Sequence, residues 1–226
     1  MTESSTKNAK RSTANKVTKR IPNEVRRERS REALLKASEE LFVARGYAIT
    51  TVEDIASQSG LTKGAIYFHF KDKSGVLIAL IDRAEERVLE PLLVRLEDPN
   101  RTPDQKIIDY LHYWSRIGIE QRSTMFLPIL MSLEFNGTGT DIEQHLDRMY
   151  GRVYEALIRI IEDGHRQGVI RKAAPAREQA AMLIAMMDGT LLEWMRREDR
   201  IDGPALTRGL RSLLLQGLIS SPPADS

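Results

Sequence analysis

The sequence predicts an all-α protein, with an N-terminal three-helix helix-turn-helix domain followed by a larger helical domain. Apolar residues recur at intervals of three and four along most of the chain, whereas the alternation typical of β-strands is nearly absent. Clusters of glycine, proline, asparagine and aspartate separate the periodic segments. Both observations favour helices joined by short connections.

Length and composition limit the class of protein. The chain has 226 residues, of which 41% are hydrophobic, enough for the core of one large domain or two small ones. It has no cysteine, which excludes disulfides and thiolate metal sites. The first twenty residues are polar and basic, unlike a secretory signal, and no run approaches the roughly 18 apolar residues of a membrane span. We therefore expect a cytoplasmic protein with no membrane partner.

Charge is distributed unevenly along the chain. Residues 1–31 contain ten lysines and arginines against three acidic residues, a net charge of +7 that leaves −5 for the rest. A basic segment before an acidic body favours a polyanionic partner at that end. Residues 1–25 are predicted to be a disordered basic tail, and a tail that is merely solvated is the alternative for residues 1–22.

The first two helices are predicted from periodicity and capping residues. Residues 26–45 carry their apolar side chains on one face, and Gly46 suits the left-handed position after a helix. Thr51 stands three residues before Asp54, the pattern of an N-cap with an acidic first turn. A second, short helix is therefore expected to begin after Thr51.

A third helix is predicted from Thr62 to about Phe70, after a break at Ser59-Gly60. Two short helices joined by a tight turn are typical of a helix-turn-helix, whose second helix lies in the DNA major groove. Ile66 and Phe70 face inward with Leu61, which leaves hydroxyl, lysine and imidazole groups facing outward toward phosphates and base edges. These outward residues are Thr62, Lys63, Ala65, Tyr67 and His69, with Gly64 for close backbone approach, Lys73 for charge and Thr51 at a positive helix end. A small helical domain with an exposed aromatic face is the alternative.

The run TVEDIASQSGLTKGAIYFHFKDKSGVL resembles the signature of the TetR family of one-component transcriptional regulators. The resemblance is dense from about Ala33 to Leu80, and elsewhere it extends only to length and helical pattern. It implies DNA-facing positions at Thr51, Thr62, Lys63, Gly64, Ala65, Tyr67, His69 and Lys73. The family often has a second tyrosine where this chain has Phe68, and usually an acidic residue where it has Gly75. The difference at Gly75 predicts a weakened, more mobile start of the next helix.

A connecting helix is predicted from Val76 to about Glu97, and Pro91 lies inside it. Proline in a helix interior removes a hydrogen bond and kinks or ends the helix. The resemblance implies that this helix joins the DNA-binding and ligand-binding parts. A mechanical joint and a plain helix end both remain open at Pro91.

Five further helices are predicted, at residues 103–120, 123–135, 142–167, 176–197 and 204–219, each bounded by residues that interrupt helices. This part shows no catalytic constellation. His112, His145 and His165 lack the spacing of metal-binding motifs, and residues 137–139 are too short for a phosphate-binding loop. We therefore expect no enzyme activity, no bound metal and no cofactor.

Methionine is concentrated between residues 125 and 195, apart from Met1. Because methionine adapts to varied apolar shapes, its clustering with aromatic residues favours an adjustable apolar cavity between helices. Ordinary core filling is the alternative, and the family resemblance favours the cavity. The predicted lining is Tyr110, Trp114, Met125, Phe126, Ile129, Tyr150, Tyr154, Met186 and Met187.

Small residues form stripes on the last two helices, where they allow close helix approach. The stripes comprise Ala181, Ala185 and Gly189, and Gly209, Leu213 and Gly217, each set spaced by four residues. In the family that the sequence resembles, the last two helices pair with those of a second copy. The stripes therefore predict a homodimer interface, with packing inside one chain as the alternative.

These observations predict a DNA-binding domain at residues 26–73 and a ligand-binding and dimerisation domain at residues 74–221. The predicted function is a homodimeric transcriptional regulator, most simply a repressor of a palindromic double-stranded operator. A small apolar or amphipathic effector would release it by a shift between two conformational populations. Two alternatives remain open: a helix-turn-helix dimer without an effector, and an all-helical enzyme.

Overall fold

A computed structural model describes residues 23–219, and within them the fold is entirely helical. Ten α-helices and one π-helical turn follow one another, and the sole β-type pairing is an isolated antiparallel bridge between Ile170 and Ile219. The predicted all-α class is confirmed. Most of the predicted basic tail, residues 1–22, lies outside the described residues, as do residues 220–226.

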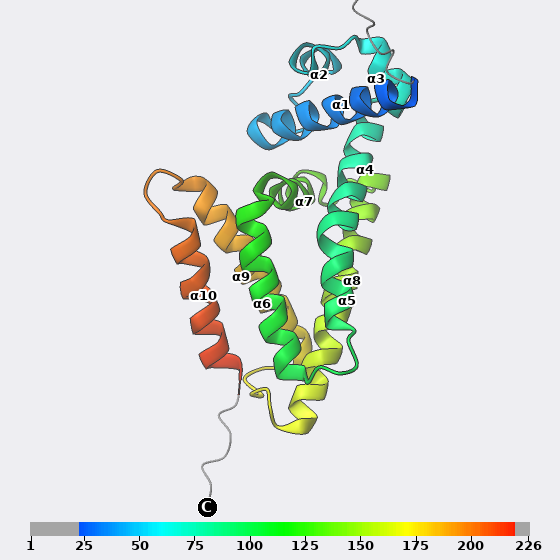
Figure 1. The fold of residues 1–226 in the computed structure, drawn as a ribbon. Helices are drawn as coiled ribbons and strands as arrows, with labels where there is room; N and C mark the ends of the chain where they lie inside the picture. The colour runs from blue at the N-terminus through cyan, green and yellow to red at the C-terminus, as the bar shows by residue number, and fades with distance from the viewer. Residues whose placement is uncertain (1–22, 220–226) are drawn as a thin grey trace, which may run out of the picture.

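The first three helices form the domain at the top of Figure 1. They are α1 (Asn23–Arg45), α2 (Val52–Ser59) and α3 (Lys63–Phe70). Leu34, Phe42, Ile55 and Ile66, fully buried, form the centre of this domain. The helix α1 begins before the predicted residue 26, so residues 23–25, which were assigned to the tail, are helical.

The N-terminus of α2 is capped as the sequence predicts. The Thr51 hydroxyl accepts a hydrogen bond from the Asp54 amide at 3.1 Å, and the Thr51 amide donates to Asp54 Oδ2 at 2.9 Å. This reciprocal pair is a capping box. Gly46 has φ +86°, the left-handed conformation expected after α1.

The connecting helix is one column made of α4 (Lys73–Ala84), the π-helical turn η1 (Glu85–Leu89) and α5 (Glu90–Leu96), as Figure 1 shows. At the end of η1 the Glu90 amide donates to the carbonyl of Glu85, five residues back. The cause is Pro91, which has no N–H and whose ring would collide with the Arg87 carbonyl in an α-helix. The helix continues past Pro91, so the plain helix end is excluded.

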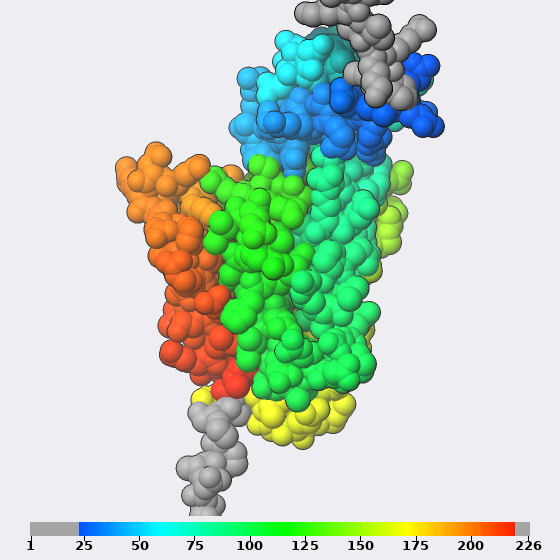
Figure 2. Space-filling model, in the orientation of Figure 1, coloured from blue at the N-terminus to red at the C-terminus, as the bar shows by residue number. Residues whose placement is uncertain are grey.

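The larger domain contains α6 (Pro103–Glu120), α7 (Arg122–Phe135), α8 (Asp141–Gln167), α9 (Ala176–Arg196) and α10 (Gly203–Leu218), each within one residue of its predicted range. The helix α8 packs on α9, α6, α7 and the connecting helix, while α10 packs on α6 and α9. Figure 2 shows α10 along one outer edge of the molecule, beside α6. None of the helices in residues 23–219 is long and apolar enough to cross a membrane.

Candidate DNA-binding surface and effector pocket

The helix α3 presents an exposed polar face at the end of the molecule away from the larger domain. Thr62, Lys63, Gly64 and Tyr67 are exposed on it, and Tyr67 leaves 55% of its surface free. Thr62 is the N-cap of α3, and its hydroxyl makes no capping hydrogen bond. These four residues therefore present two hydroxyls, one ammonium group and one bare stretch of backbone.

Two predicted DNA contacts have partners on α2. The Lys63 ammonium group forms an ion pair with Glu53, and hydrogen bonding to this carboxylate raises the pKa of Lys63. Thr51 is exposed, but its hydroxyl also donates to Asp54 Oδ2 at 2.6 Å. The Thr51 hydroxyl is therefore engaged in the cap of α2. A bound anion would interact here with the positive end of the helix rather than with a free hydroxyl donor.

The remaining three predicted DNA contacts, Ala65, His69 and Lys73, are partly buried. Ala65 packs against the core, and His69 Nε2 lies 3.1 Å from Ser30 Oγ on α1. Burial, followed by the charges of Arg27 and Arg31, lowers the pKa of His69. His69 is thus a neutral contact between α3 and α1 at pH 7.

Lys73 requires a correction. Its ammonium group points into the domain and donates to the carbonyls of Tyr47 and Thr50, both at 2.8 Å. It also lies 4.1 Å from the centre of the Tyr47 ring, and burial lowers its pKa. Two of its three N–H groups thus hold the α1–α2 connection, so its main role is structural rather than phosphate neutralisation.

Two aromatic rings of α3 lie close to arginines of α1, and sequence reasoning did not assign these pairs. The Arg27 guanidinium lies 5.4 Å from the centre of the Phe68 ring, and Arg31 lies 5.5 Å from that of Phe70. Phe68 is 68% exposed, so this arginine–phenylalanine pair is part of the outer surface. The many charged side chains at residues 26–32 concealed the pair in the sequence.

The turn between α3 and α4 changes the interpretation of Gly75. Lys71 has φ +72°, and the amide of Asp72 donates to the Phe70 carbonyl at 2.8 Å, which makes a γ-turn. This turn carries the Phe70 oxygen to only 2.0 Å from the point where a Cβ of residue 75 would lie. Asp72 Oδ1 accepts hydrogen bonds from Ser74 Oγ and the Gly75 amide. Gly75 is therefore required by a close approach, and the start of α4 is capped rather than weakened.

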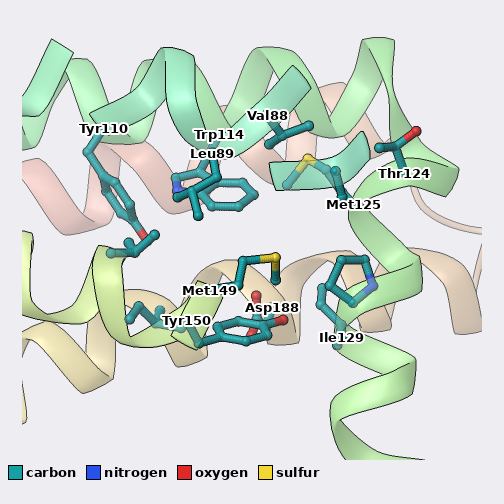
Figure 3. Close-up of a pocket in the computed structure, with 14 residues that line it drawn as sticks. Val88, Leu89, Tyr110, Trp114, Thr124, Met125, Ile129, Met149, Tyr150 and Asp188 are labelled. Atoms are coloured by element: carbon teal, nitrogen blue, oxygen red, sulfur yellow. The ribbon is translucent and has the colours of Figure 1, made fainter. Parts of the chain in front are cut away.

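A cavity of about 50 Å³ lies inside the larger domain, between the connecting helix and α6 to α9. Figure 3 shows Val88, Leu89 and Trp114 on one side of it and Met149, Tyr150 and Asp188 on the other. Its lining is almost entirely apolar or aromatic. The fourteen lining residues are Ala84, Val88, Leu89, Tyr110, Trp114, Thr124, Met125, Pro128, Ile129, Met149, Tyr150, Val153, Ile184 and Asp188.

The cavity contains five of the nine residues predicted for it: Tyr110, Trp114, Met125, Ile129 and Tyr150. The other four were wrongly placed. Met187 lines a smaller neighbouring cavity with Trp114 and Met125, and Phe126 is buried under Arg122, 5.6 Å from its ring centre. Tyr154 and Met186 are partly buried outside the lining. The prediction missed nine lining residues: Ala84, Val88, Leu89, Thr124, Pro128, Met149, Val153, Ile184 and Asp188.

Asp188 is the acidic group of the cavity, and it has no ion pair or hydrogen bond with any residue in the range 23–219. Burial alone raises the pKa of Asp188 to about 7. Burial, with the charge of Asp188 next, also raises the pKa values of the Tyr110 and Tyr150 hydroxyls. A second polar group, the buried Nε1 of Trp114, has no hydrogen-bond acceptor within the described residues.

We predict that Asp188→Asn stabilises the fold in a pH-dependent manner. The pKa of the Asp188 carboxyl group rises from 3.8 to about 7 on folding. The free energy of unfolding therefore decreases as the pH increases through that interval. The shift sets an upper limit of about 4 kcal/mol, and the amide retains some desolvation cost, so a gain of about 1–3 kcal/mol is expected at pH 8. Thermal unfolding should show this gain at pH 8 and little difference near pH 4. An equal difference at both pH values would contradict the prediction.

The DNA-binding domain is joined to the wall of the cavity through α7. Near its start, Thr124 lines the cavity and donates to Glu39 Oε1 on α1 at 2.9 Å. Near its end, the Glu134 carboxylate accepts the amides of Tyr47 and Ala48 at 3.0 and 2.6 Å. The helix α7 therefore connects the cavity wall directly to α1 and to the α1–α2 connection.

A charged cluster joins α8 to the connecting helix on the outside. Arg152 Nη1 lies 2.5 Å from Glu85 Oε1 and 2.6 Å from Glu90 Oε1, so it spans η1. His145 Nε2 lies 3.2 Å from Asp82 Oδ1 and 3.5 Å from Glu85 Oε2. Although His145 has no metal-binding motif in sequence, folding brings it to two carboxylates. Arg152 already pairs with Glu85, so one of the two carboxylates beside His145 has a cationic partner.

The stripes predicted for dimerisation lie on the surface of one chain. Ala181, Ala185, Gly189, Gly209, Leu213 and Gly217 are all exposed. Leu213 leaves 69% of its surface free, and a Cβ added at Gly189, Gly209 or Gly217 would meet no atom of residues 23–219 within 4 Å. Packing inside the chain therefore does not explain these small residues.

Comparisons with known proteins agree with this arrangement. Residues 34–80 match the family described as bacterial regulatory proteins, tetR family, and residues 138–218 match the C-terminal region of BetI-type transcriptional repressors. The HTH-type transcriptional repressor BepR of Brucella suis biovar 1 (strain 1330) is 31% identical over 177 residues, 76% of this chain and 84% of BepR.

Two solved structures extend the likeness over most of the fold. The MbdR regulator from Azoarcus sp. CIB is 36% identical, with a TM-score of 0.76, over 84% of this chain and 100% of that chain. The transcriptional regulator FadR from Bacillus subtilis, solved in complex with stearoyl-CoA, shares the fold at 22% identity and a TM-score of 0.65, over 82% and 98%. The helix-turn-helix and the helical domain behind it both match, and the chain belongs to the TetR family of bacterial transcriptional regulators.

Proposed function

We propose that this protein is a transcriptional repressor that binds a palindromic double-stranded operator in the cytoplasm and leaves it when a small molecule fills the cavity. Residues 26–73 would bind DNA, and residues 74–221 would bind the effector and dimerise. The observation that carries the proposal is the position of α7, which lines the cavity and also contacts the DNA-binding domain at Glu39, Tyr47 and Ala48. BepR, a relative, is itself named a repressor.

The cavity volume supports a two-state mechanism. A volume of about 50 Å³ is far below the roughly 300 Å³ or more of a typical ligand site, so a ligand must enlarge the cavity on entering. Enlargement displaces α7 or the connecting helix, which form part of the wall. The ligand thereby favours a conformation in which the DNA-binding domain is repositioned, and operator favours the other conformation.

Homodimerisation follows from the requirement for specificity and from the exposed stripes. One helix-turn-helix reads too few base pairs for a specific site, whereas a two-fold dimer reads two half-sites about 34–36 Å apart. We propose that α9 and α10 pack against the same helices of a second copy through the stripes defined above. Among residues 23–219, a Cβ added at Gly209 or Gly217 would meet no atom within 4 Å, which supports this assignment.

Substitutions on the exposed face of α3 test the DNA-binding assignment. Tyr67→Phe and Lys63→Ala should each weaken operator binding about tenfold without changing the helical content, because both residues are exposed at the surface. Lys63→Ala should also flatten the dependence of log K on log salt by about one unit. An operator selected from random DNA and quantitative gel shifts provide the measurement. Lys36→Ala, on the exposed surface of α1, is the control, and unchanged affinity in both α3 variants would rule out this face.

A further inference from the structure

We propose that Asp188 is the recognition point of the cavity and that the effector is a small organic cation, an ammonium group carried on an apolar body. The inference rests on the proposed function, because it names the chemical class of the molecule that fills the cavity. It concerns a residue to which the DNA-binding and dimer contacts assign no role.

The protein itself supplies no partner for the Asp188 carboxylate. The fourteen lining residues include no lysine, arginine or histidine. Hydrogen bonds and ion pairs to Asp188 are likewise absent across residues 23–219. Asp188 is partly buried, and a carboxylate that is largely desolvated and has no protein partner is costly, so an apolar residue at this position of α9 would stabilise the fold. A positively charged ligand group is the partner that offsets this cost.

Three aromatic rings surround the same space. Tyr110 and Trp114 meet edge to face with their ring centres 6.1 Å apart, and Tyr150 lines the opposite wall beside Asp188. Aromatic faces attract cations through their quadrupole, most strongly where water is excluded, and cages of such rings bind quaternary ammonium groups. One carboxylate and three rings therefore favour an organic cation over a hydrated metal ion, which needs several oxygen ligands.

The rest of the wall selects the body of the ligand. Met125, Ile129, Met149 and Val153 present only apolar surface, and the two methionines adapt to different shapes. A carboxylate or phosphate head group would be repelled by ionised Asp188. A neutral apolar molecule would fit the walls but would leave the carboxylate desolvated. An amphipathic cation satisfies both the apolar walls and Asp188.

The ionisation of Asp188 makes binding of a permanent cation dependent on pH. The other titratable groups that face the cavity are Tyr110 on α6 and Tyr150 on α8, and burial keeps both neutral. The connecting helix and α7 contribute no titratable side chain to the lining. Because the pKa of Asp188 is about 7 without ligand, cation affinity should rise as the pH increases from 6 to 8.

The test compares two compounds of the same shape, benzyltrimethylammonium and its neutral isostere neopentylbenzene, with phenylacetate as an anion. Calorimetry at pH 6 and pH 8 measures binding to the full-length protein, to Asp188→Asn and to Asp147→Asn. Asp147 is an exposed carboxylate on α8, so its substitution makes the same change in net charge away from the cavity. Benzyltrimethylammonium does not titrate, so any pH dependence reports the protein.

We expect the wild-type protein to bind benzyltrimethylammonium at least tenfold more tightly than neopentylbenzene at pH 8, and less so at pH 6. Asp188→Asn should lose this preference, and Asp147→Asn should keep it. Equal binding of the two compounds, a preference for phenylacetate, or no binding of the cation overturns the proposal. Operator release is measured separately. Cation binding without operator release would support the cation site at Asp188 and reject its role as the effector site. Operator release by only neutral or anionic compounds would support the proposed repressor function and reject a cationic effector.

Discussion

Gly75→Ala should destabilise the DNA-binding domain and abolish operator binding. The added methyl group would lie 2.0 Å from the Phe70 carbonyl oxygen, a backbone atom fixed by the γ-turn at Lys71. Relief requires the turn to open, which reorients α3 relative to α4 and breaks the hydrogen bond from the Gly75 amide to Asp72. We expect a loss of about 2–4 kcal/mol in unfolding free energy.

The matched control is Gly151→Ala in the middle of α8, where a Cβ meets no atom within 4 Å. Alanine at such a helical site should stabilise by up to about 1 kcal/mol. Thermal unfolding and gel shifts of both variants decide the matter. If Gly75→Ala unfolds at the wild-type temperature and binds operator normally, the close approach of Phe70 to residue 75 is wrong.

Gly217→Arg should convert the proposed dimer to a monomer and remove specific operator binding, although every α3 residue is intact. Within the described part of the chain, no atom lies within 4 Å of a Cβ added at Gly217, so one chain should accept the arginine and retain its helical content. In a packed dimer the same side chain would separate α10 from its partner and bury an unpaired charge, at a cost of several kcal/mol. Sedimentation equilibrium measures the mass, and gel shifts measure the operator affinity.

The control for this prediction is Gln216→Arg, an exposed neighbour on the same helix that points about 100° away from residue 217. It adds the same charge and should remain dimeric. A Gly217→Arg protein that sediments as a stable dimer and binds its operator would place the dimer interface elsewhere.

The helix-turn-helix was predictable because its signals are local. Thr51 and Asp54 lie one helical turn apart, so the capping box is determined by short-range contacts that the sequence displays. Lys73 was not predictable in the same way, since its two acceptors lie more than twenty residues earlier in the chain. Gly75 depends on a turn conformation at Lys71 that no residue preference indicates.

The sequence predicted that a cavity exists, but not all of the residues that line it. Periodicity shows which side of a helix is buried, but it does not show whether that side meets a neighbouring helix or the cavity. Phe126 and Met187 were therefore placed in the lining although they pack elsewhere. Asp188 had a usable signal, because it is the only charged residue between positions 179 and 192. An isolated charge inside a long apolar run indicates a buried polar site rather than a solvated helix face.

The π-helical turn at Glu85–Leu89 has a mechanical consequence. Its last two residues, Val88 and Leu89, form part of the cavity wall, and Pro91 two residues later donates no main-chain hydrogen bond. We therefore expect a ligand to press on the segment of the connecting column whose main-chain hydrogen bonding departs from that of an α-helix. We expect force applied there to change the winding of the turn, so that the column bends at this point instead of moving as one rigid rod. Amide exchange should accordingly be fastest at this joint and slow on either side of it.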